Sequence, residues 1–94
     1  MDIPRFQFDY SFLDLDELRT QCVETDEIES VFYAPSSVYS DWHKTDNIGY
    51  MIGYSFKNKF ISFTFELTGN GNVVRFIDAF LSNEYEIRTR YYGF

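Results

Sequence analysis

The chain has 94 residues and a formal net charge of −7, with 45% hydrophobic and 24% charged residues. A chain of this size rarely holds two independent cores, and its composition is that of an ordered globular protein rather than of a disordered one. We therefore expect a single domain over residues 1–94. Aromatic side chains make up 21% of the residues and supply much of the volume that its core needs.

Charge and cysteine content exclude several classes of protein. The chain has 15 acidic and 8 basic residues, whereas broad nucleic-acid binding needs clustered Lys and Arg. A single Cys cannot form an intrachain disulfide, and one Cys with one His does not provide the spacing of a zinc site. No apolar run approaches the roughly 20 residues of a membrane span, and the N-terminus lacks the pattern of a signal peptide. We expect a cytoplasmic protein without a cofactor, a metal or a membrane association.

The acidic excess lies in the first half of the chain. Residues 1–43 hold ten acidic and two basic residues, whereas residues 44–94 hold five acidic and six basic residues. An acidic half of this kind favours solubility or docking onto a basic partner.

Residues 1–34 predict a strand and two helices. Residues 3–10 alternate between aromatic and polar side chains, as a half-buried strand does. Ser11 is the expected N-cap of a first helix, and Thr25 is the expected N-cap of a second helix that ends before Pro35. The side chains that we expect these helices to bury are Leu15, Leu18 and Cys22 in the first and Ile28, Val31 and Phe32 in the second.

The rest of the chain predicts three strands and a closing helix. Residues 35–47 are polar and indicate a connection, with no more than a brief strand at 37–39. Alternating segments follow at 48–56, 60–67 and 73–80, separated by two short turns. The third segment is apolar on both faces, which favours the centre of a sheet. Ser82 is the expected cap of a final helix that ends before Gly93. The fold class is therefore α+β: an antiparallel β-meander with two N-terminal helices and a C-terminal helix.

Most candidate reactive groups have a plain structural explanation. The carboxylates near residues 14–17 and 26–29 are typical of solvated helix N-termini, and Cys22 is expected in the core. The aromatic residues of the strands, including Phe63 and Phe65, are more often core residues than base-stacking platforms.

The basic residues of the second half allow two interpretations. In a meander with a returning helix, Lys57, Lys59, Arg75, Arg88 and Arg90 could converge and hold a phosphodiester. Alternatively, Arg75 pairs with a carboxylate such as Glu66, and the two late arginines complement the helix dipole.

Several motifs resemble those of the BrnT-type toxin family over residues 6–91. Phe6-Gln7-Phe8-Asp9 resembles its Phe-x-(Trp/Phe)-Asp strand, and residues 27–32 with Pro35 resemble its Glu-(Val/Ile)-Glu-x-(Val/Ala)-Phe helix and the proline after it. Gln21-Cys22-Val23 stands where the family has His-Gly-Val. The resemblance implies a RelE-like fold, an RNA endonuclease that blocks translation and a cognate antitoxin as partner. The site residues that it implies are Arg75 and Lys59 for the phosphate and Glu84 and Tyr91 for proton transfer.

Three departures from the family pattern keep two functions open. The family's histidine is Gln21, and two of its arginines are Tyr54 and Phe80. In the first interpretation the chain is the toxin-like component of a type II toxin–antitoxin system and cleaves RNA with the four remaining residues. In the second it is a catalytically degenerate, acidic protein-binding module of the same fold, whose helices dock a basic partner.

Overall fold

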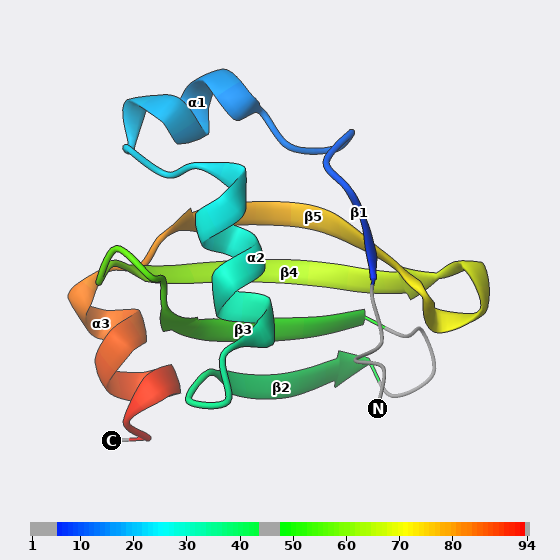
Figure 1. Cartoon of the computed structure of the whole chain (residues 1–94). Coiled ribbons are helices and arrows are strands. Elements are labelled where there is room, and N and C mark those ends of the chain that lie inside the picture. The colour runs from blue at the N-terminus through cyan, green and yellow to red at the C-terminus, as the bar shows by residue number, and fades with distance from the viewer. Residues whose placement is uncertain (1–5, 44–47, 94) are drawn as a thin grey trace.

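A five-stranded mixed sheet organises the chain, and the computed structural model describes residues 6–43 and 48–93 of it (Figure 1). The strand order is β1-β5-β4-β3-β2. The predicted residues 3–5 of the first strand lie outside the described residues, as do residues 44–47 of the predicted connection. The elements in chain order are β1 (Gln7–Asp9), α1 (Leu15–Thr20), α2 (Thr25–Tyr33), β2 (Val38–His43), β3 (Ile48–Tyr54), β4 (Phe60–Thr68), β5 (Val73–Leu81) and α3 (Glu84–Glu86), which continues as a π-helical turn (Ile87–Tyr91).

The α+β class is confirmed, with three corrections to the sheet. Strands β2 to β5 form an antiparallel meander, but β1 pairs with β5 in parallel, so the sheet is mixed. The central strand is β4 rather than β5, because two strands lie on each side of β4 in the strand order. On the other side of β5, β1 covers only its first three residues. Residues 38–43 form a full strand where the sequence predicts a connection. That strand lies at the sheet edge, where polar residues are tolerated and pairing with β3 compensates for weak hydrophobic alternation.

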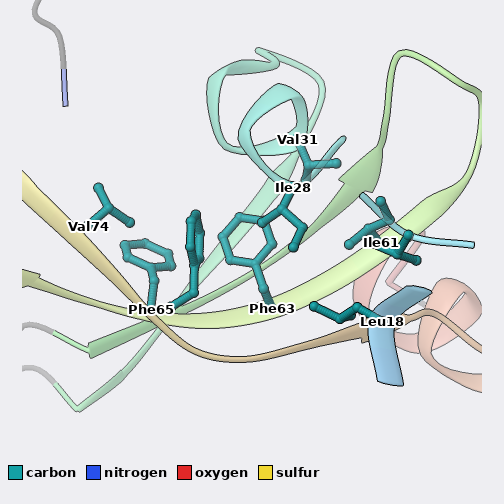
Figure 2. Close-up of a cluster of buried hydrophobic side chains, with 9 residues drawn as sticks. Leu18, Ile28, Val31, Ile61, Phe63, Phe65 and Val74 are labelled. Carbon is teal, nitrogen blue, oxygen red and sulfur yellow. The ribbon is translucent and has the colours of Figure 1, made fainter. Parts of the chain in front are cut away.

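Helix α2 crosses one face of the sheet and closes the main core (Figure 1). Figure 2 shows the side chains of this core, which come from both N-terminal helices and from strands β4 and β5. The expectation that Phe63 and Phe65 are core residues is confirmed, since both are buried. The buried members of the cluster are Leu18, Val23, Ile28, Val31, Ile61, Phe63, Phe65, Val74 and Phe76.

Each helix has a different N-cap residue from the one that the sequence predicts, although α2 begins at Thr25 as expected. Asp14 caps α1 by accepting a hydrogen bond from the Glu17 N–H at 3.1 Å, because Ser11 belongs to the preceding turn. Glu24 caps α2, and Thr25 is its first helical residue. Asn83 rather than Ser82 caps the last helix, because the Ser82 hydroxyl instead shares a hydrogen bond with Ser62 at 2.6 Å.

Cys22 is exposed at the end of α1, so its predicted place in the core is wrong. Its φ is +60°, the left-handed region that favours glycine. The Val23 N–H donates to the Leu18 carbonyl and the Cys22 N–H to the Arg19 carbonyl, which is the hydrogen-bond pattern of a Schellman motif. Helix α1 therefore ends at Thr20, before the predicted apolar stripe reaches Cys22. Leu15, which the sequence also predicts to be buried, is exposed.

The C-terminal helix packs on the other face of the sheet, at the end that holds the β3–β4 turn (Figure 1). The Tyr91 ring packs edge-on against Phe60 and Tyr54, both of which point away from α2. Gly93 has a φ of +75° just past the helix end, as the sequence predicts. Among the described residues, no helix is long and apolar enough to cross a membrane.

Candidate functional site

Arg75 lies in the middle of a row of three charged residues on neighbouring strands. Asp9 of β1 and Glu66 of β4 are its direct partners in the two ladders. The Arg75 Nε donates to a carboxylate oxygen of Asp9 at 3.1 Å, and its Nη1 lies 3.5 Å from a carboxylate oxygen of Glu66. Side chains of paired residues point to the same face, so the row lies on the face opposite α2. The structural interpretation, in which Arg75 pairs with Glu66, is confirmed, and Asp9 is a second partner that the sequence did not reveal.

The surroundings of Arg75 leave little of its charge unbalanced. The Phe12 ring centroid lies 5.2 Å from the guanidinium carbon and covers one of its sides. The pKa of Asp9 is lowered, first by hydrogen bonds from Ser11 and then by Arg75, so this carboxylate is ionised at neutral pH. A phosphate that approached Arg75 would compete with two carboxylates already in contact with it.

Lys59 lies at the other end of β4 and contacts α1 and α2. Its ammonium group donates to the Cys22 carbonyl oxygen and lies 3.4 Å from a carboxylate oxygen of Glu27. The Glu27 side chain is fully buried, whereas the sequence predicted a solvated acid at this position. Glu27 completes a capping box, in which its carboxylate accepts from the Glu24 N–H at 3.1 Å.

A hydrogen-bond network makes this burial of a charged group favourable. The Ser55 hydroxyl donates to the other Glu27 oxygen at 3.0 Å and accepts from the N–H groups of Lys57 and Lys59. Burial raises the pKa of Glu27, but the hydrogen bonds from Glu24 and Ser55 and the charge of Lys59 outweigh it, so the pKa lies below its ordinary value. Lys59 therefore joins the β3–β4 turn to the first turn of α2.

The two proton-transfer candidates share the C-terminal helix but not a site. Glu84 is exposed in its first turn and pairs with Arg88 at 3.2 Å. Tyr91 ends the helix, with its ring centroid 4.9 Å from that of Phe60. The pairing of Arg88 with a carboxylate one turn earlier adds local helix support.

The four predicted site residues do not form one cluster. Glu66, the partner of Arg75, comes six residues after the start of β4, whereas Lys59 directly precedes that strand. Lys59 and Glu66 are thus seven residues apart, and at about 3.3 Å per residue this places Arg75 and Lys59 about 23 Å apart along the sheet. The Lys59 ammonium reaches the face that α2 covers, whereas Tyr91 packs on the opposite face. No common position near all four side chains is available for a phosphodiester.

The sequence does not predict the polar cluster of Tyr50, Glu86 and Arg90 at the C-terminal helix. The Tyr50 hydroxyl donates to a carboxylate oxygen of Glu86 at 3.0 Å, and the guanidinium carbon of Arg90 lies 4.5 Å from the centroid of the Tyr50 ring. Burial and the Glu86 carboxylate raise the pKa of Tyr50 to about 12, and Ser62 opposes part of that rise. Tyr50 is therefore protonated at neutral pH and anchors the helix. No spacing motif joins these residues, so only the fold reveals the contact.

Comparison with models of known protein families and with the sequences of curated proteins gives no match. Among the described residues, no group of three or more His, Cys, Asp or Glu side chains is placed to hold a metal ion.

Proposed function

We propose that this protein is a catalytically degenerate, toxin-like component of a type II toxin–antitoxin system, with a BrnT-type, RelE-like fold. The order of its elements supports this: an opening strand, two helices, a meander and a C-terminal helix. Cys22 adds support from a different kind of observation, because it stands at the family's glycine and has a φ of +60°. A position that needs a left-handed backbone is where a family keeps glycine.

Within this fold, the geometry supports protein binding better than RNA cleavage. The observation that carries this conclusion is the state of Arg75, which contacts two carboxylates across two strand ladders. Transition-state stabilisation at a phosphodiester needs cations that are aimed at the developing charge rather than paired beside it. Lys59 is likewise bound to Glu27. The chain is thus best described as a catalytically degenerate member of the fold that binds a basic protein, such as a cognate antitoxin.

Expression in a bacterial host tests this proposal. We expect that the wild-type protein does not arrest growth, that purified protein does not cleave total RNA, and that a small basic protein encoded beside its gene co-purifies with it. Growth arrest by the wild type that Arg75→Ala relieves would contradict the binding function and restore the nuclease. Growth arrest that persists in Arg75→Ala and in Lys59→Ala would place a toxic activity elsewhere in the chain.

A further inference from the structure

Strand β5 has an edge that β1 covers only in part. The β1–β5 ladder runs from Gln7↔Val73 to Asp9↔Arg75 and ends there, because the chain turns away at residues 10–13. At the far end of β5, the Leu81 N–H points away from β4 and donates to the Gln21 side-chain oxygen at 3.0 Å.

Between these two contacts, residues 76–80 of β5 have outward-facing backbone groups that are not part of the described ladders. The Ser82 N–H donates to Phe60 of β4, and backbone direction alternates along a strand, so the N–H and C=O of Ala79 point the same way as those of Leu81. Unpaired outward groups of this kind form a template for another strand.

A groove of about 340 Å³ runs along this edge, between β5 and α1. Figure 1 shows α1 lying alongside β5, beyond the end of the short strand β1. The apolar side chains of the groove include Phe12, a large aromatic residue that is nevertheless 61% exposed. The residues that line the groove are Phe12, Leu13, Asp14, Glu17, Leu18, Gln21, Ile77, Asp78, Ala79 and Phe80.

The charge of the groove indicates what would occupy it. Asp14, the N-cap of α1, Glu17 of α1 and Asp78 of β5 all line the groove, and none of the described lining residues is Lys or Arg. The acidic rim repels a nucleic-acid backbone and attracts Lys and Arg side chains.

We propose that this groove binds an extended, basic segment of a partner protein, which adds to the sheet as a strand beside residues 76–80 of β5. Backbone hydrogen bonds to Ala79 supply the pairing, apolar side chains of the segment pack on Phe12 and Leu13, and its basic side chains meet the three carboxylates. The inference rests on the protein-binding function proposed above and assigns that function to one edge of the sheet.

Selection of peptides tests the inference without knowledge of the natural partner. A display library of random 12-residue peptides is selected on the immobilised full chain, and the affinity of each selected peptide is measured by fluorescence anisotropy. We expect the selected peptides to alternate Lys or Arg with β-branched or aromatic residues. N-methylation of alternate residues in one register of the peptide should weaken binding by about tenfold or more, and N-methylation in the other register should not.

Two variants of the protein locate the binding edge. Ala79→Pro removes the outward N–H from an edge position and should abolish binding. The triple variant Asp14→Asn, Glu17→Gln and Asp78→Asn should weaken it several-fold at low salt, and asparagine keeps the N-cap of α1. The matched control changes the same number of charges outside the groove, with Asp16→Asn, Asp26→Asn and Glu84→Gln, and should bind as the wild type does. If Ala79→Pro does not fold, the charge variants and the methylated peptides decide the question.

Other outcomes overturn the inference in distinguishable ways. In one outcome, the selected peptides bind the triple variant as tightly as the wild type and are insensitive to N-methylation. That result would show that peptides bind elsewhere on the protein, so it would contradict the role of this groove but not the binding function. Self-association of the wild type that Ala79→Pro abolishes, measured by sedimentation, would assign the edge to a second copy of the chain. If no peptide is selected, the groove does not bind extended basic segments. If a protein encoded by the adjacent gene still co-purifies in that case, the proposed binding function is retained at another site.

Discussion

The ammonium nitrogen of Lys59 lies 3.4 Å from a carboxylate oxygen of Glu27, whose side chain is fully buried. The two residues come from the β3–β4 turn and from the first turn of α2, and they are 32 residues apart in the sequence. A buried carboxylate is stable only when its charge is paired and its oxygens are hydrogen-bonded. This contact therefore fixes the helix on the sheet, and it explains the position of Lys59 without a role in RNA binding.

Glu27 should give the fold a measurable dependence on pH. Because its pKa in the folded protein lies below the ordinary value of 4.5, its ionised form stabilises the fold above about pH 4.5, and this stabilisation is lost as the pH falls through the folded-state pKa. Glu27→Gln should cost about 1–3 kcal/mol at pH 7. The difference between wild type and variant should shrink when urea unfolding is measured at pH 3.

The neighbouring acid provides the control for this prediction. Asp26 is exposed in the same first turn of α2, and Asp26→Asn should change the free energy of unfolding by less than about 0.5 kcal/mol at either pH. Equal effects of the two substitutions at pH 7 would show that Glu27 is not the anchoring carboxylate.

Cys22→Gly should stabilise the protein. The left-handed backbone at Cys22 is unfavourable for a residue with a Cβ, by about 1 kcal/mol, whereas glycine adopts it freely. After the greater flexibility of glycine in the unfolded chain is subtracted, we expect a gain of about 0.5 kcal/mol in the free energy of urea unfolding. Cys22→Ala keeps the Cβ and removes the thiol, so it should leave stability nearly unchanged. A gain in the alanine variant equal to that in the glycine variant would rule out the backbone as the cause.

Strands β3, β4 and β5 of the meander could be predicted from the sequence, because period-2 alternation records which face is covered, whereas the polar strand β2 could not. Phe63 and Phe65 are buried as that pattern predicts. The parallel pairing of β1 with β5 could not be predicted in this way, because alternation gives the face of a strand but not its neighbour. For the same reason the partnership of Asp9 with Arg75 appears only in the folded chain.

The N-caps show a different limit of sequence interpretation. Ser11 and Asp14 are both good caps on propensity, and the choice between them depends on where the preceding turn ends. Glu27 carried one usable signal, since Glu24 and Glu27 have the three-residue spacing of a capping box. That spacing predicts a bonded carboxylate but not a buried one, because burial depends on the arrival of Ser55 and Lys59 from a distant turn.

Phe63→Ala should be strongly destabilising. The ring is fully buried between α2 and the sheet (Figure 2). It packs edge-on against Phe76 with ring centroids 5.1 Å apart. We expect a loss of about 3–5 kcal/mol, or a milder loss in Phe63→Leu if the alanine variant does not fold. Phe56→Ala, at an exposed phenylalanine in the turn, is the control and should cost less than about 1 kcal/mol. Similar melting temperatures for wild type and Phe63→Ala would contradict the core assignment.

Arg75 gives the prediction that best separates a structural cation from a catalytic one. Removal of the guanidinium in Arg75→Ala leaves Asp9 of β1 and Glu66 of β4 on the two sides of β5 without a cation between them. Because the three side chains are partly exposed, we expect a modest loss of stability, about 1 kcal/mol at low ionic strength, that decreases in 0.5 M NaCl.

The reverse experiment releases the cation instead of removing it. Asp9→Asn with Glu66→Gln keeps the shapes of both partners and removes their charges, so Arg75 becomes available to an incoming phosphate. If Arg75 serves only to join three strands, this double variant should be no more active on total RNA than the wild type, and its fold should be as intact by circular dichroism. Cleavage that appears in the double variant and disappears when Arg75→Ala is added would show that the carboxylates suppress a latent nuclease. In that case the pairing of Arg75 would be a means of inhibition, and the RNA-cleaving interpretation of this fold would replace the one proposed here.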